Sequence, residues 1–234
     1  MIVEICANGF ESASNAKESG ADRIELCTQL AVGGLTPSRD EISEVFKNLQ
    51  IEMHVLIRPR KGNFVYAAEE LEDMIVGIAF CKEIGCHGVV SGVLTSEGNI
   101  DLRATKRLIK AADGMEFTFH RAFDECNEPI KEIENLIDLG VTRLLSSGQE
   151  HKAIDGLGLL IQLKDIAGDR LEIMAGSGIN ADNALVFKIA GFPSIHLSAT
   201  SNKTAVKVTD SFFETGSEGV SDVNIIKEVI SKVK

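Results

Sequence analysis

The sequence contains no uninterrupted apolar stretch of about 18 residues, the length at which a helix can cross a membrane. Basic residues are also few, since 24 Lys and Arg stand against 35 Asp and Glu, a formal net charge of -11. Nucleic acids and anionic membranes both require a basic surface. The N-terminal segment Met1–Glu4 lacks the basic region of a secretory signal. We therefore expect a cytoplasmic protein whose partners are neither nucleic acid nor membrane.

Several catalytic and cofactor-binding motifs are absent as well. No Walker or kinase motif occurs, and no set of His, Asp and Glu residues has the spacing of a zinc hydrolase. The loop after the first expected strand, Ala7–Phe10, is not the glycine-rich loop of a dinucleotide-binding fold. The five cysteines are odd in number and lack the regular spacing of a secreted disulfide scaffold. Free thiols in a reducing compartment are the expected state.

Eight short, apolar-rich segments of two alternating types are present. One type follows a glycine suited to the end of a preceding helix; its members are 20–27, 85–92, 140–147 and 191–198. The other type has a glutamate at or near its start, namely Glu4, Glu52, Glu116 and Glu172. Both types have the length and composition of buried strands.

Helical patterns separate these strands. A capping box of Ser38 and Glu41 predicts a helix that extends to about Leu49. Apolar residues at helical spacing predict further helices over 69–84, 102–112, 129–139, 153–166 and 181–190, and a last helix over 222–233 after a long loop, 200–220. Strand and helix alternating eight times favour a TIM (β/α)8 barrel with parallel strands, one domain over 1–234 with an extra C-terminal helix. The alternative is an open, doubly wound sheet.

Chemistry in such barrels lies at the carboxyl ends of the strands. There the triplet Glu-x-Cys occurs twice, at Glu4–Cys6 and Glu25–Cys27. Side chains alternate along a strand, so each triplet directs a carboxylate and a thiol to the same face. Cys6 and Cys27 are either a soft-metal site suited to Cu(I) or small core residues, and Cys126 is either a third ligand or a loop thiol.

Other strand ends carry groups suited to acid–base chemistry. Strand parity places Glu25, Cys27, His120, His196 and Ser198 on the inward face. His120 with Asp124 has the composition of a general acid–base pair, or else of a hydrogen-bonded loop anchor.

Groups suited to anion binding follow other strands. Arg58 and Arg60 are suited to clamping an anion, or to a salt bridge with Glu4 or Glu25. The glycine-rich turn 176–178, followed by Asn180 as an expected helix N-cap, offers backbone N–H groups to a phosphate. The full set of anion-binding candidates is Arg58, Arg60, Ser147, Gly148, Gly176, Ser177, Gly178, His196 and Ser198.

The chain resembles the copper homeostasis protein CutC family. The segments that carry the resemblance are 21–27 (ADRIELC), 33–38 (GGLTPS), 57–60 (IRPR), 119–124 (FHRAFD), 147–148 (SG) and 195–199 (IHLSA). The resemblance implies a TIM barrel, a cytoplasmic location and copper-binding cysteines at Cys6 and Cys27.

Two functions remain open at this stage, beside a scaffold whose polar lumen is only an internally satisfied network. The first is copper homeostasis, with Cu(I) held by Cys6 and Cys27. The second is an enzyme that acts on a small anionic, possibly phosphorylated, metabolite, with Glu25, His120, Asp124 and Arg58 as catalytic groups. A homo-oligomer is compatible with either.

Overall fold

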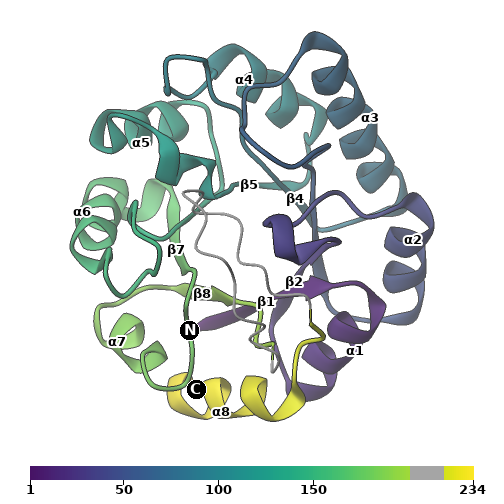
Figure 1. The fold of residues 1–234 in the computed structure, drawn as a ribbon, viewed down its shortest axis with the longest axis vertical. Helices are drawn as coiled ribbons and strands as arrows, with labels where there is room; N and C mark the ends of the chain where they lie inside the picture. The colour runs from purple at the N-terminus through teal and green to yellow at the C-terminus, as the bar shows by residue number, and fades with distance from the viewer. Residues whose placement is uncertain (201–218) are drawn as a thin grey trace.

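The computed structural model describes residues 1–200 and 219–234, and it shows eight parallel strands closed into a barrel (Figure 1). Each strand pairs with the next along the chain, and the last pairs with the first. The predicted TIM barrel is confirmed. The strands are β1 (Ile2–Asn8), β2 (Arg23–Cys27), β3 (Glu52–Leu56), β4 (Gly88–Ser91), β5 (Glu116–Phe119), β6 (Arg143–Ser146), β7 (Glu172–Gly176) and β8 (Ser194–Leu197).

Helices surround the barrel, as Figure 1 shows. They are α1 (Phe10–Ser19), α2 (Arg39–Asn48), α3 (Ala68–Ile84), α4 (Leu102–Ala111), α5 (Pro129–Asp138), α6 (Leu157–Ala167), α7 (Ala184–Ile189) and α8 (Val223–Val233). Short 3-10 turns are η1 (Leu30–Val32), η2 (Arg121–Glu125) and η3 (Gly168–Arg170). The capping box of α2 forms as predicted, because Ser38 accepts from the Glu41 backbone and the Glu41 carboxylate accepts from the Ser38 backbone. Among the described helices, none has the length and hydropathy that a transmembrane span requires.

Two helices begin later than predicted because loop contacts come first. Helix α6 starts at Leu157 instead of residue 153, since the Ala153 N–H donates to the Ser177 carbonyl in the loop after β7. Helix α7 starts at Ala184 instead of residue 181, with Asn183 at its N-cap position. The prediction of Asn180 as that N-cap was therefore wrong; its side chain closes a preceding turn by accepting from the Asp182 N–H.

The final helix is confirmed, with Asp222 as its N-cap. Most of the predicted loop 200–220 lies outside the described residues.

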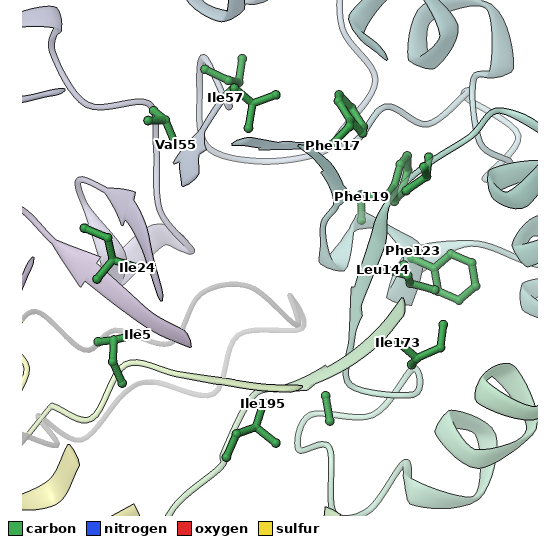
Figure 2. Packing of buried hydrophobic residues seen from close by; sticks show 14 of the residues in the cluster. Ile5, Ile24, Val55, Ile57, Phe117, Phe119, Phe123, Leu144, Ile173 and Ile195 are labelled. Carbon is green, nitrogen blue, oxygen red and sulfur yellow. The ribbon is translucent and has the colours of Figure 1, made fainter. Parts of the chain in front are cut away.

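The apolar core lies between the barrel and its helices (Figure 2). Alternate strand residues point outward beneath the helices, and Ile5, Ile24, Phe119 and Ile195 are each fully buried there. This outward apolar face leaves the opposite side chains of every strand for the barrel interior.

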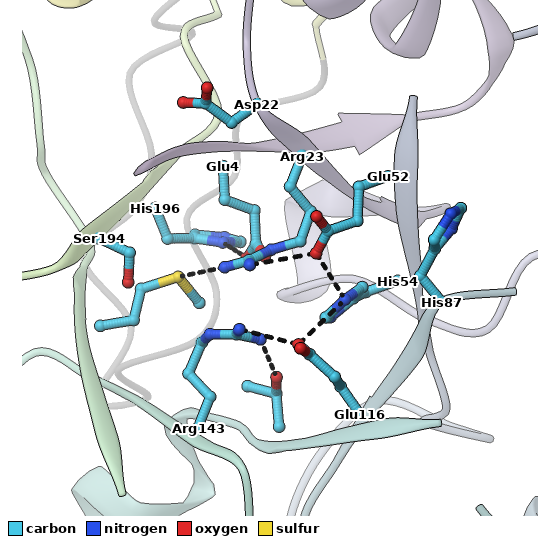
Figure 3. A network of polar contacts seen from close by, with 12 residues as sticks. Glu4, Asp22, Arg23, Glu52, His54, His87, Glu116, Arg143, Ser194 and His196 are labelled. Atoms are coloured by element: carbon cyan, nitrogen blue, oxygen red, sulfur yellow. Dashed lines mark hydrogen bonds and ion pairs between the residues drawn. The ribbon is translucent and has the colours of Figure 1, made fainter. Parts of the chain in front are cut away.

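The interior toward the amino ends of the strands is charged. Two arginines each contact two glutamates on neighbouring strands, and we call these sets the Glu–Arg–Glu bridges: Glu4–Arg23–Glu52 and Glu116–Arg143–Glu172 (Figure 3). Arg23 and Arg143 are almost fully buried. Buried guanidinium groups are tolerated only when paired and hydrogen-bonded, so the glutamates that open the odd-numbered strands are the counter-ions of the barrel interior.

Candidate metal and acid–base site

Strand register assembles a cluster of donors nearer the carboxyl ends of the strands. Parallel pairing sets Cys6 of β1 beside Glu25 of β2, and Glu4 beside His196 of β8. The Cys6 and Cys27 sulfurs lie 3.6 Å apart, and the Cys6 sulfur lies 3.8 Å from Glu25 Oε1. One ligand atom each of Cys6, Glu25 and His196 falls within 4.8 Å of the others. Three strands therefore bring two thiols, a carboxylate and an imidazole to one place.

This cluster is enclosed. Cys27 is fully buried and Cys6 is 6% exposed, and they pack with Leu30, Leu56 and Val90. The loop after β2 covers Cys27, because a Cβ placed on Gly34 would lie 3.3 Å from Cys27 Cβ and 2.8 Å from a Leu56 methyl. Gly34 also has a φ of 84°, which side chains rarely adopt. Glycine is thus needed for the loop to close over the sulfur.

Burial and neighbouring charges shift the acidities in opposite directions. Burial raises the pKa of Glu25 to about 7, with the Glu4 carboxylate adding to the rise. Burial likewise acts to raise the pKa of Glu4, but a hydrogen bond from His196 and the Arg23 charge hold that pKa well below its usual range. The pKa of His196 is raised, since Glu25, Cys6 and Glu4 outweigh the opposing effect of burial. The cluster therefore contains a carboxyl group that can exchange a proton near neutral pH.

The Cys6 thiol is held protonated. Hydrogen bonding with Cys27 and burial raise the pKa of Cys6 well above its ordinary value. A metal that binds here must displace a thiol proton, so its affinity increases with pH. Sulfur–metal bonds of about 2.3 Å, as in zinc–thiolate sites, allow one ion to contact both sulfurs at their separation. The donor set fits a soft metal ion without rearrangement of the strands.

Backbone strain is concentrated in the loops at the carboxyl ends of the strands. Among the described residues, four other than glycine have positive φ: Gln29, Gln149, Ser177 and Ala199. They lie in the loops that follow β2, β6, β7 and β8. Such strain is costly, of order 1–3 kcal/mol per residue, and it tends to accumulate at functional sites.

Asp124 serves loop structure in this conformation. Its carboxylate accepts from Ser146 Oγ, Ser147 N and Oγ, and Gln149 N, and it pairs with Arg121 at 2.9 Å. Five groups from two loops thus converge on one buried carboxylate.

His120 is positioned separately from Asp124. Its Nδ1 accepts from the Ala122 N–H at the start of η2, and its ring packs against Phe64. Burial lowers the pKa of His120 to about 3, with the Arg58 charge adding to the effect. The imidazole is therefore neutral at physiological pH.

Arg58 and Arg60 bind the chain's own backbone. Arg58 donates to the carbonyls of Val32, Gly34 and Gly62 and lies over the Phe64 ring. It therefore joins the loop after β2 to the loop after β3. Arg60, more exposed, pairs with Glu70 at 2.6 Å and donates to backbone carbonyls.

The remaining anion-binding candidates lie on loops at the carboxyl end. Ser147 contacts Asp124, and the Gly148 N–H donates to Ser146 Oγ. Ser177 donates to the His151 carbonyl, and the Gly178 carbonyl accepts from the side chains of Asn180 and Asn183. The Ser198 carbonyl accepts from the Ser221 hydroxyl. Gly176 is the last residue of β7 and lies in register with His196 of β8. Cys126 lies against Gln149 and is absent from the described contacts of Cys6 and Cys27.

Sequence reasoning missed the roles of several interior residues. His54, which points into the barrel between Glu52 and Glu116, was not among the candidates. Arg23 and Arg143 were noted only as members of strand segments. The available signal was the glutamate at or near the start of each odd-numbered strand, because four glutamates that face one lumen require counter-charges.

The closed eight-stranded barrel, with donor side chains at its strand ends, places this protein in the (β/α)8 barrel class. Comparison with known proteins identifies its family. Residues 1–201 match the model of the CutC family. The chain is 43% identical over 224 residues to a CutC-family protein of Glaesserella parasuis, covering 95% of this chain and 92% of that protein. A relative from Photobacterium profundum is 37% identical, with 99% and 95% covered. The chain belongs to the CutC family.

Solved structures agree with this assignment. The CutC protein of Streptococcus agalactiae, whose name connects it with copper homeostasis, superimposes with a TM-score of 0.81 at 35% identity, covering 85% of this chain and 98% of that one. Thiamine phosphate pyrophosphorylase of Pyrococcus furiosus superimposes with a TM-score of 0.61 at 16% identity, covering 99% and 95%. The second likeness shows the shared fold alone.

Proposed function

We propose that this protein acts in copper homeostasis in the cytoplasm by binding Cu(I) through Cys6 and Cys27. The observation that carries this proposal is the 3.6 Å separation of the two sulfurs, which come from different strands and are both buried. Thiolates select Cu(I) over harder ions. The name of the Streptococcus agalactiae relative supports the same role.

Two further groups complete the proposed site. His196 supplies a nitrogen donor within 4.8 Å of the Cys6 sulfur, suited to a third ligand position. Glu25 lies next to Cys6 and is suited to receive the thiol proton that the metal displaces, because its pKa is about 7. The copper ion is then the cargo, and the enclosure by Leu30 and Leu56 limits its access to water.

Titration of the anaerobic, reduced protein with Cu(I) against a chromophoric chelator tests this proposal. We expect one tightly bound Cu(I) per chain. Cys6→Ser and Cys27→Ser should each reduce affinity at least 100-fold, because a lone thiolate leaves the ion under-coordinated.

The chain offers a matched control in its second pair of buried thiols. Cys81 and Cys86 lie at the end of α3, where hydrogen bonding between them and burial raise the pKa of Cys81. Cys81→Ser should leave Cu(I) affinity unchanged. Equal losses in Cys81→Ser and Cys27→Ser, or no thiol-dependent stoichiometry at all, would refute the proposal.

A second candidate function is acid–base catalysis on a small anionic metabolite. The geometry of Glu25 favours it: the carboxyl group is 4% exposed, and its Oε2 has no hydrogen-bonding partner among the described residues. A buried carboxyl group with an unsatisfied oxygen is suited to receive a proton from a bound substrate. Arg58, His120 and Asp124 would then position the surrounding loops.

Ligand screening separates the two candidates. Anionic metabolites, including sugar phosphates, would be tested for a rise in the melting temperature of metal-free protein. A hit that persists in Cys27→Ser but is lost in Glu25→Gln supports the enzyme. Absence of any such hit, together with thiol-dependent copper binding, leaves copper homeostasis.

A further inference from the structure

In the Glu–Arg–Glu bridges, an arginine on β2 or β6 lies between glutamates on the two adjacent strands. Strand β4 has no such arginine. Arg23 stands in register with Glu52, and Arg143 stands in the same way with Glu172. On β4 the equivalent position, in register with Glu116, is Gly88. No arginine therefore separates Glu52 from Glu116 on this side of the barrel, although both carboxylates point to the same gap (Figure 3).

The ring of His54 fills the space that Gly88 leaves. A Cβ on Gly88 would lie 2.7–2.8 Å from three atoms of that ring, so no larger residue fits there while His54 keeps its place. His54 is fully buried, and neither ring nitrogen has a hydrogen-bonding partner of ordinary geometry among the described residues. A buried imidazole that lacks a well-formed hydrogen bond is costly, which points to a missing ligand.

The distances within this cluster match those of metal ligands. His54 Nε2 lies 3.3 Å from Glu52 Oε1 and 3.6 Å from Glu116 Oε2, and the three donor atoms fall within 4.8 Å of one another. Tetrahedral bonds of about 2.0–2.1 Å place neighbouring donor atoms roughly 3.3 Å apart. Each carboxylate has two oxygens, so it can bind an ion and keep its arginine.

Charge and access favour a cation at the same place. Each Glu–Arg–Glu bridge has two carboxylates for one guanidinium group, and Glu4 has His196 as a further partner. Glu52 and Glu116, which face each other, are therefore the carboxylates that a divalent ion would neutralise. The side chains of Glu52 and Glu116 are 40% and 43% exposed, whereas His54 is buried. An ion can therefore arrive from the amino end of the barrel and meet the histidine from outside.

We infer that Glu52, His54 and Glu116 form a site for a divalent transition-metal ion, of which Zn²⁺ is the best-suited probe. Imidazole with carboxylates is a donor set for zinc and its neighbours, unlike the sulfur pair at the other end. Catalysis in these barrels takes place at the carboxyl ends of the strands. The metal at the amino end thus stabilises the barrel, because it ties β3 to β5 across the glycine of β4.

The test uses the full chain with Cys6→Ser and Cys27→Ser, so that the sulfur site does not contribute. Calorimetric titration with Zn²⁺ and absorption spectroscopy with Co²⁺ should both give one ion per chain, without sulfur-to-metal charge-transfer bands. Zn²⁺ should also raise the melting temperature, as any ligand specific to the folded state does. His54→Gln, Glu52→Gln and Glu116→Gln should each weaken Zn²⁺ binding at least tenfold.

Matched controls exist at the same end of the barrel. Glu172 is a bridge glutamate outside the cluster, and His87 is a neighbouring histidine whose Nδ1 accepts from the Met53 N–H. Glu172→Gln and His87→Gln should leave Zn²⁺ affinity unchanged.

Two results would overturn the inference. One is the absence of stoichiometric binding with all three ligands present. The other is undiminished binding in both Glu52→Gln and Glu116→Gln, whose partly exposed positions make misfolding of these variants a minor concern. Neither result bears on copper binding at the sulfur pair, because the site residues differ.

Discussion

The two ends of the barrel lumen shift the pKa of a buried glutamate in opposite directions. Glu4 and Glu25 are both buried, on neighbouring strands, yet the pKa of Glu4 is lowered and that of Glu25 is raised. Arg23 and His196 contact Glu4 directly, whereas a thiol is the hydrogen-bonding neighbour of Glu25. Burial alone therefore does not decide the protonation state of a carboxyl group; the nearest counter-charge does. The amino end is built from ions, and the carboxyl end from groups that can exchange protons or bind a soft metal.

Removal of the Arg23 guanidinium group from the amino end of the lumen should have the largest effect on stability. Arg23→Met leaves the fully buried Glu4 without its guanidinium partner. We expect a loss of about 3–5 kcal/mol in the free energy of unfolding, measured by urea denaturation. Arg107→Met, which removes a surface pair with Glu72, should change stability by less than about 1 kcal/mol. Equal effects of the two substitutions would contradict the role given to the Glu–Arg–Glu bridges.

The next largest effect is the pH dependence contributed by Glu25. Its pKa of about 7 in the folded protein exceeds the value of 4.5 expected when unfolded, so the folded state binds the extra proton between these pH values. The Glu25 contribution to stability is complete below pH 4.5 and is lost as pH rises to about 7. In metal-free protein, Glu25→Gln should remove this loss, on the order of 3 kcal/mol. Urea denaturation at a series of pH values measures it; parallel curves for the two proteins would count against the raised pKa.

The packing of Gly88 against His54 gives a smaller effect. Gly88→Ala should cost about 1–3 kcal/mol, because the new methyl group would collide with the imidazole. Gly77 in α3 is the control, since a Cβ there would make only an ordinary contact of 3.6 Å with Ile57. Gly77→Ala should stabilise the protein by up to about 1 kcal/mol through the lower backbone entropy of alanine. Thermal unfolding of both variants tests the opposite signs.

The smallest effect concerns Glu52 and runs opposite to that of Glu25. The close contact with the His54 ring, and secondly the Arg23 charge, lower the pKa of Glu52 to about 2. Its contribution to stability is present above pH 4.5 and is lost as pH falls toward 2. Because the side chain is 40% exposed, solvent screening should keep this contribution below about 1 kcal/mol. Glu52→Gln should flatten the acid side of the stability curve only, and a change above pH 5 would contradict this assignment.

The sequence predicted the barrel because its signals were local and repeated. Glycines that end helices, glutamates that open strands and the Ser38 capping box each specify structure within a few residues. Strand parity also predicted the inward face of Glu25, Cys27 and His196, whose neighbours the structure now defines.

The arrangement of the polar side chains depended on long-range geometry. Arg58 was predicted to bind an anion or a barrel glutamate, and the structure shows in addition that it joins two loops whose paths no local pattern specifies. The link between His54 and Glu116 requires the register of three strands and the absence of a side chain at Gly88. Such contacts emerge only once the barrel is closed.

The pairing of β8 with β1 also bears on when the site can come into existence during synthesis. Cys6, Glu25 and Cys27 are translated early, but His196 and its contact with Glu4 follow about 190 residues later. Until the last strand docks, the two thiols have no imidazole beside them, and Cys6 lies on β1, an unpaired sheet edge. Glu52 and His54 come from β3 and Glu116 comes from β5, both in the first half of the chain. A ribosome-bound intermediate can therefore assemble the amino-end cluster before the sulfur pocket is complete, and copper capture through the full donor set must await barrel closure.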